Sequence, residues 1–197
     1  MKKIIILTLC LMLLFTACSS KEAPANVSTT SISETANASI PENYVGDATL
    51  ETLKALLNMH VIIETQYLIK DRPAVDFETE IEYNGSIYVP VTGGIFSTYD
   101  EFKEAIYDTY VKESADFALN STTMYADIDG QFCFNTYYKD FFSGENYTHD
   151  WSEFTIEPTE ATDDKIVFTV YLKYSSGDVA AITMTALMQD GNWRLIR

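Results

Sequence analysis

The sequence predicts an α+β domain over residues 47–197, in which N-terminal helices pack on a curved antiparallel sheet. Three observations predict this class. Apolar residues recur at helical spacing between residues 48 and 69, and again between residues 99 and 110. Alternating runs dominate from residue 124 onward, and short glycine-containing turns separate them. Helices followed by a run of strands are typical of α+β folds.

The first predicted helix covers residues 48–69. Asp47 is its candidate N-cap, and neither glycine nor proline interrupts it before Pro73. Its wide apolar stripe predicts a well-buried helix. The stripe contains Leu50, Leu53, Leu56, Leu57, Val61, Ile62, Ile63 and Leu68. We expect His60, within this helix, to be a packed residue rather than a ligand, because only Glu64 lies at a spacing suited to a second ligand.

Residues 76–83, the acidic segment, alternate strictly and predict a strand. Such a strand points Phe77, Thr79, Ile81 and Tyr83 to one face, and Asp76, Glu78, Glu80 and Glu82 to the other. Asn84-Gly85 predicts a hairpin turn into a second strand over residues 87–89. No Lys or Arg interrupts the acidic face. It is therefore either a solvated edge strand or a docking surface for a basic partner.

A second amphipathic helix is predicted after Ser97, its candidate N-cap. Its apolar face carries Tyr99, Phe102, Ile106 and Tyr110. A shorter helix is predicted from Ser114.

The rest of the chain is predicted to be β-structure. Asp129-Gly130 turns a hairpin between residues 124–128 and 131–136. The antiparallel meander comprises residues 165–174, 179–189 and 193–197, with residues 154–156 as a fourth strand before it.

The first 17 residues have the pattern of a secretory signal peptide. Lys2 and Lys3 precede an apolar run that is too short to span a bilayer as a mature helix. Thr16-Ala17-Cys18 then resembles the lipobox of bacterial lipoproteins, which implies cleavage before Cys18 and lipidation of that residue. Residues 18–46 are rich in Ser, Thr, Asn and Ala and predict a flexible linker. We therefore expect a lipoprotein anchored at the extracytoplasmic face of a bacterial membrane.

The chain is strongly acidic, with 13 Lys and Arg against 29 Asp and Glu and a net charge of −16. Removal of residues 1–17 takes away two lysines and no acid, which leaves 11 − 29 = −18 on the mature protein. This charge argues against binding to nucleic acid or to anionic wall polymers. It favours a basic protein as the partner.

The sequence contains no recognisable catalytic motif. Glycine-rich phosphate loops, Cys-x-x-Cys and His-Glu-x-x-His are absent, and His60 and His149 are the two histidines. Asp127 begins a pattern similar to a calcium loop, but Tyr138 occupies the position of the required Glu. Cys133 is expected to be a buried structural thiol. We therefore expect a protein that is not an enzyme and needs neither metal nor cofactor. An enzyme, the remaining alternative, would need a His or carboxylate pair buried in the concavity of the sheet.

Residues 139–151 form a second candidate contact region. Residues 125–151 hold nine of the 26 aromatic residues. Aromatic anchors on a loop suit a protein contact, whereas core packing uses the same residue types equally well. The candidate partner-binding residues of this region are Phe141, Phe142, Glu145 and Tyr147.

Several stretches occur together with the lipobox and the leucine-rich helix. They are Ile87-Tyr88-Val89, residues 96–103, the hairpin from Tyr125 to Phe132, residues 163–167 and Asp190-Gly191-Asn192-Trp193. This layout resembles the IseA-type inhibitors of cell-wall DL-endopeptidases over roughly residues 50–197. It is also similar to NTF2-like and cystatin-like domains, which many bacterial lipoproteins share.

The resemblance implies a non-catalytic protein that blocks the active-site cleft of NlpC/P60-type peptidoglycan peptidases. Its acidic surface would dock on a basic cell-wall hydrolase. The alternative is an NTF2-like binding module that holds a small ligand or a peptidoglycan fragment on its concave sheet. A pocket of Tyr and Phe with one or two convergent polar groups would favour the binding module. A filled concavity with carboxylates on its rim would favour the inhibitor.

Overall fold

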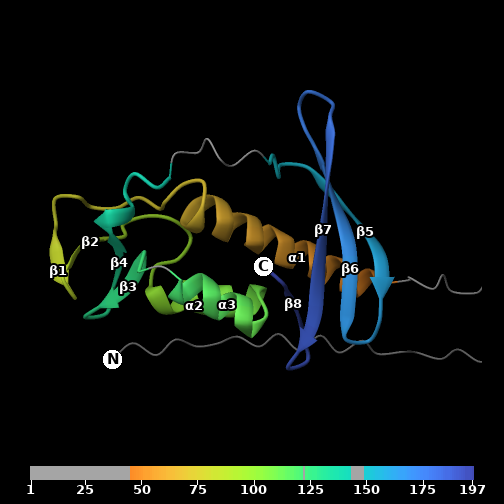
Figure 1. The fold of residues 1–197 in the computed structure, drawn as a ribbon, viewed down its shortest axis with the longest axis horizontal. Helices are drawn as coiled ribbons and strands as arrows, with labels where there is room; N and C mark the ends of the chain where they lie inside the picture. Colours follow the sequence, from red (N-terminus) through yellow and green to blue (C-terminus); the bar gives the residue numbers. More distant parts are fainter. Residues whose placement is uncertain (1–44, 122, 143–148) are drawn as a thin grey trace, which may run out of the picture. The chain divides into compact units, whose positions relative to one another are not determined.

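The computed structural model describes residues 45–121, 123–142 and 149–197, which form three α-helices and two antiparallel sheets (Figure 1). The predicted α+β class is confirmed. The strands, however, divide between two four-stranded sheets instead of one, with the orders β1-β2-β4-β3 and β5-β6-β7-β8. Figure 1 shows the helices between these two sheets.

The first helix is α1 (Asp47–Ile63), which continues as the π-helical segment η1 (Glu64–Leu68). Together they cover nearly all of the helix predicted from the sequence. Gly46 is the N-cap instead of Asp47, whose carboxylate lies in the first turn, where the helix dipole favours a negative charge. Full burial is confined to one face, along Leu53, Leu57 and Ile63.

The second helix, α2 (Tyr99–Thr109), begins with a capping box one residue later than predicted. The Thr98 hydroxyl accepts the Glu101 N–H at 3.1 Å, and the Glu101 carboxylate accepts the Thr98 N–H at 3.3 Å. The third helix, α3 (Lys112–Asn120), follows after two residues. Between them, the Val111 N–H donates to the Leu195 carbonyl at 2.9 Å and ties the helices to the last strand.

The first sheet contains β1 (Ile81–Tyr83), β2 (Ser86–Pro90), β3 (Tyr125–Ile128) and β4 (Gln131–Asn135), and η2 (Thr136–Tyr138) follows it. Both predicted hairpin turns are confirmed. Asn84-Gly85 and Asp129-Gly130 have positive φ at both positions, as the tight turns of two-residue hairpins require.

The predicted strand over residues 76–83 is wrong in its first part. Only Ile81–Tyr83 pair as a strand, and Phe77 to Thr79 form a turn. The Asp76 carboxylate stabilises this turn by accepting the Glu78 N–H at 3.0 Å and the Thr79 hydroxyl at 2.8 Å. Phe77 is therefore 43% exposed, although the alternation assigned it to the apolar face.

The second sheet contains β5 (Phe154–Ala161), β6 (Lys165–Lys173), β7 (Val179–Gln189) and β8 (Asn192–Leu195). The predicted meander is thus confirmed, and β5 is longer than expected. Strand β6 alternates as predicted and buries Ile166, Phe168, Val170 and Leu172. Strand β8 pairs with Ala186–Gln189 only, so β7 extends beyond its neighbour.

The core lies where the helices meet the inner faces of both sheets. Rings of Tyr67, Phe102, Tyr125, Phe132 and Phe134 contact one another there, with centroids 5.2–6.2 Å apart. Cys133 is buried, as predicted, in a smaller cluster on the other face of the first sheet, and burial raises the pKa of its thiol.

Candidate functional site

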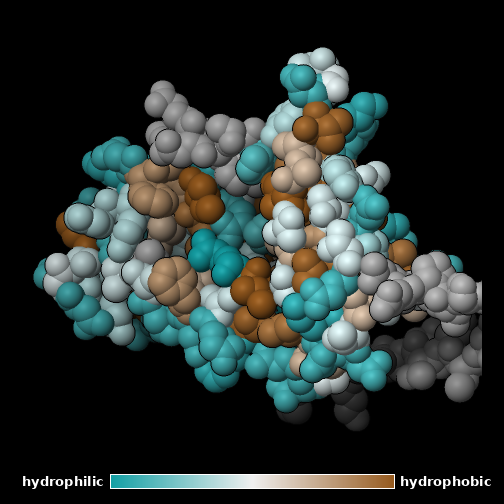
Figure 2. Space-filling view, turned by 45° about the vertical axis from the view of Figure 1, so that its right-hand side comes forward, coloured by the Kyte–Doolittle hydropathy of each residue, from teal (hydrophilic) through white to brown (hydrophobic). Residues whose placement is uncertain are grey.

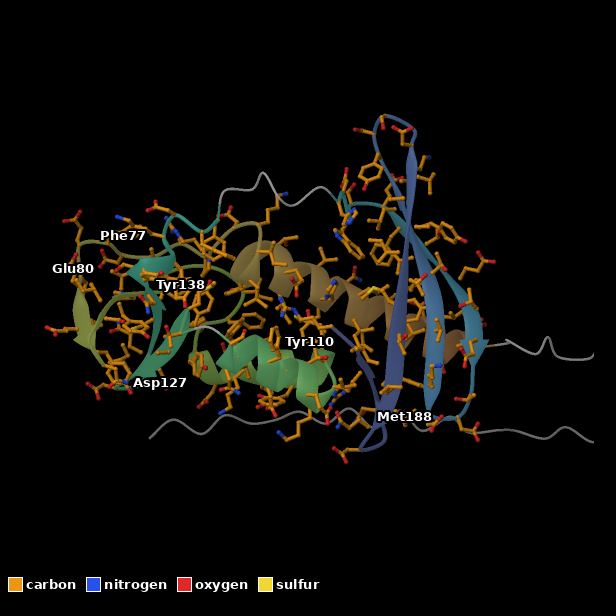
Figure 3. All side chains as sticks on the ribbon, viewed as in Figure 1. Phe77, Glu80, Tyr110, Asp127, Tyr138 and Met188 are labelled. Carbon is orange, nitrogen blue, oxygen red and sulfur yellow. The ribbon has the colours of Figure 1, made fainter. Side chains whose placement is uncertain are left out.

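The acidic segment and residues 139–142 of the second predicted contact region lie at the same end of the fold (Figure 3). Trp151, the last residue of that region, instead packs against His60 of α1 and Phe154 of β5. Phe77, Glu80 and Tyr138 lie at the end that carries the first sheet, whereas Tyr110 lies at the centre and Met188 on the second sheet. The acidic segment enters β1, and residues 139–142 follow η2 directly. Strands β2 and β4 pair side by side and so bring together segments that are far apart in the sequence.

Arg72 connects the two regions. Its guanidinium carbon lies 4.9 Å from the centroid of the Phe77 ring and 5.9 Å from that of the Phe134 ring. The Phe142 ring in turn lies 6.0 Å from the Phe134 ring and 5.6 Å from the Phe141 ring. Phe142 is half-buried against the core, whereas Phe141 is 57% exposed. The aromatic pair is therefore divided between packing and surface.

Large apolar side chains remain exposed around this junction: Phe77, Ile87, Tyr137 and Phe141. The Thr136 hydroxyl donates to the Ile87 carbonyl at 3.0 Å, which places η2 beside β2. Glu82 pairs with Ile87 across the β1–β2 ladder, so these two side chains share a face. Tyr83 points to the opposite face, where its ring contacts the Tyr88 ring at 6.0 Å.

The four predicted carboxylates have different roles. Asp76 is engaged in the turn that it stabilises. Glu78, Glu80 and Glu82 are exposed, and no described Lys, Arg or His forms an ion pair with them. We define the acidic–aromatic surface as Glu78, Glu80 and Glu82 together with Phe77, Ile87, Tyr137 and Phe141. Glu145 and Tyr147 lie outside the described residues, as do Cys18, the signal peptide and most of the linker.

A buried polar network, which no local sequence pattern predicts, lies at the centre of the fold. Glu64, 4% exposed, accepts Arg197 Nε at 2.5 Å, Arg197 Nη2 at 3.4 Å and the Tyr110 hydroxyl at 3.3 Å. His60 Nδ1 lies 2.8 Å from that hydroxyl. Burial lowers the pKa of His60, with the charge of Glu64 opposing and that of Arg197 reinforcing the shift. His60 is thus a packed residue, as predicted.

A cavity of about 550 Å³ opens beside this network. Its walls combine the apolar side chains of Ile69, Trp151, Ile182, Met184 and Ile196 with His60, Glu64, His149, Thr183, Thr185 and Arg197. Figure 2 shows hydrophobic side chains on both sides of a hydrophilic recess. Among the described residues, its walls contain neither Tyr nor Phe, unlike the pocket that the binding-module alternative calls for.

The described ranges contain no cluster of three His, Cys, Asp or Glu side chains placed to hold a metal ion. No helix in the same part of the chain is long and apolar enough to cross a membrane. No protein-family model matches the chain, and no curated protein matches it. The candidate site therefore depends on the geometry of the acidic–aromatic surface alone.

Proposed function

We propose that the chain is a lipid-anchored, extracytoplasmic and non-catalytic regulator that binds a basic cell-wall hydrolase through the acidic–aromatic surface. The resemblance suggests an NlpC/P60-type DL-endopeptidase as the hydrolase and inhibition as the outcome. The observation that carries the proposal is the exposure of Phe77 and Phe141 at the end of the fold that also carries Glu78, Glu80 and Glu82, which have no ion-pair partner among the described residues.

This composition fits the anatomy of protein interfaces. Aromatic anchors supply most of the binding energy in such interfaces, and a polar rim surrounds them. Unpaired glutamates in the rim raise the rate of association with a basic partner and fix its orientation. The Arg72 guanidinium packs over the Phe77 ring, which reduces the side-chain entropy that this anchor loses on binding.

The experiment measures peptide cleavage by purified NlpC/P60 endopeptidases from the same organism, with and without the full chain in mild detergent. The wild-type protein is expected to slow cleavage at micromolar concentration, and inhibition should weaken as salt screens the charges. The triple variant Glu78→Gln, Glu80→Gln, Glu82→Gln should bind about tenfold more slowly. Phe77→Ala should weaken inhibition while leaving stability nearly unchanged, because the ring is 43% exposed.

The matched control is Glu104→Gln, Glu113→Gln, Glu153→Gln. These three glutamates are exposed, and their substitution removes the same net charge from elsewhere on the domain. The control should inhibit like the wild type. Equal loss in both triple variants would show that net charge alone matters, and absence of inhibition at low salt would reject the proposal.

A second candidate function, a binding module for a small ligand or a peptidoglycan fragment, is favoured by the cavity of about 550 Å³, which lies in the size range of ligand pockets. Soluble peptidoglycan fragments should then raise the melting temperature of the protein. A ligand-induced shift without any peptidase inhibition would replace the first proposal by this one.

A further inference from the structure

Part of strand β7 has an unpaired edge. Strand β8 ends at Leu195, and the Ile196 N–H makes a last bond of this ladder to the Thr185 carbonyl at 2.9 Å. Main-chain groups of alternate residues in an antiparallel strand point to opposite sides. Since Thr185 faces β8, Thr183 and Ala181 also direct their N–H and C=O groups to that side. Among the described residues, no main-chain group pairs with them there.

The opposite edge of the sheet is protected, and this one is not. Strand β5 carries Pro158 and a register shift between Pro158 and Glu160, both of which discourage pairing with another chain. The free part of β7, residues 179–184, contains neither a charged residue nor a proline. It is a regular strand, continuously paired with β6 on its other side.

The cavity adjoins this free edge. Ile182, Thr183 and Met184 form one wall, and His60, Glu64 and Trp151 contribute to the rest. Trp151 Nε1 is buried and has no hydrogen-bond partner among the described residues, which is costly for an indole N–H. Arg197 forms an ion pair with Glu64, so this carboxylate is not left as an unpaired charge in the cavity wall.

We propose that an extended peptide segment of a partner protein pairs with the free edge of β7, in the line of β8. Its main chain bonds to Ala181 and Thr183. An uncharged, apolar side chain enters the cavity beside Ile182 and Met184 and contacts the Trp151 side chain. Peptide main chain is the occupant that this surface specifies, because unpaired N–H and C=O groups recur there at two-residue spacing. The site is separate from the acidic–aromatic surface.

The experiment selects random decapeptides displayed on phage against the full chain in mild detergent, with Thr183→Pro as the counter-selection. Proline at this position removes an N–H that bonds nothing in the sheet, so the fold should survive, as urea unfolding checks. Selected peptides should bind the wild type at least about tenfold more tightly than Thr183→Pro. Thr183→Val keeps the N–H and the shape of the side chain and should bind like the wild type.

A second measurement uses only the wild-type protein. A selected peptide is synthesised in two versions, one with N-methyl groups on its odd-numbered amides and the other on its even-numbered amides. One version should lose binding and the other should keep it, because a paired strand directs alternate N–H groups to β7. The Trp151 indole proton should also shift in the NMR spectrum.

Three outcomes would overturn the proposal. The first is a selection in which no peptide is enriched over the counter-selection, and the second is equal binding by both N-methyl versions. The third is self-association that Thr183→Pro abolishes, which would make a second copy of this chain the occupant of the edge.

Discussion

Removing the positive charge beside Glu64 should strongly destabilise the fold. In Arg197→Met the Glu64 carboxylate loses two donors and its counter-ion, and of its three donors only the Tyr110 hydroxyl remains. Breaking a buried ion pair costs about 3–5 kcal/mol, because the remaining charge stays buried. The Arg197 side chain is 24% exposed and borders the cavity, so water screens the charge in part. The lower end, about 3 kcal/mol, is therefore the expected loss.

Urea unfolding followed by circular dichroism measures this loss. With a slope of about 2 kcal/mol per molar urea, the midpoint should fall by about 1.5 M. Lys165→Met is the matched control, since Lys165 pairs with Glu160 at 3.1 Å on the surface and both side chains are at least 40% exposed. That variant should lose less than about 1 kcal/mol.

The double variant Glu64→Gln, Arg197→Met distinguishes the cost of the unpaired Glu64 charge from the cost of the lost hydrogen bonds. The glutamine side chain that replaces Glu64 still accepts the Tyr110 hydroxyl but carries no charge, so at least about 2 kcal/mol should be recovered. If Arg197→Met cost no more than Lys165→Met, the pair would contribute no more than a surface contact. If the double variant recovered none of the stability lost in Arg197→Met, the unpaired Glu64 charge would not be the cause of that loss.

Three further predictions test other parts of the structure. The pKa of His60 is lowered from 6.5 in the folded state, so the unfolded chain takes up this proton first as pH falls. The free energy of unfolding should therefore decrease below about pH 6.5, and it should decrease less in His60→Gln. Urea titrations between pH 7.5 and 5 measure both. Gly94→Ala should cost about 3 kcal/mol of stability, because Gly94 has φ +101° and an added Cβ would collide with the Tyr67 hydroxyl. In the control Gly46→Ala, the added Cβ meets no atom within 4 Å, so the loss should be less than about 1 kcal/mol. Thermal unfolding measures both. Asp76→Ala should remove the turn before β1 and cost about 1 kcal/mol, with faster amide exchange at Glu78, while Glu80→Ala should leave exchange unchanged.

Local main-chain chemistry explains which elements the sequence predicts well. The turns at Asn84-Gly85 and Asp129-Gly130 depend on residues that tolerate positive φ, and the alternation of β6 depends on one buried face. The strand predicted for the acidic segment is wrong in its first part because the Asp76 side chain stabilises a local turn there instead. Alternation alone does not reveal that Asp76 bonds to its own neighbours.

Contacts between distant residues explain what the sequence leaves open. Strand β2 pairs with β4, although two helices lie between them in the sequence. Strands β1 to β4 thus form a sheet separate from that of β5 to β8, where one sheet was expected. Glu64 and Arg197 are 133 positions apart, and no local pattern links them. In residues 139–142, the aromatic content predicts contacts of some kind but does not distinguish Phe142, which packs, from Phe141, which stays exposed.

The last residues of the chain complete the packing of its first helices. Leu195 binds the segment between α2 and α3, Arg197 binds Glu64, and the Arg197 N–H donates to the Ser114 hydroxyl at 3.1 Å. Such long-range closure makes folding slow, because much loop entropy is lost before the final contacts form. Because a chain is synthesised from its N-terminus, its helices are complete before residues 195–197 can close the fold.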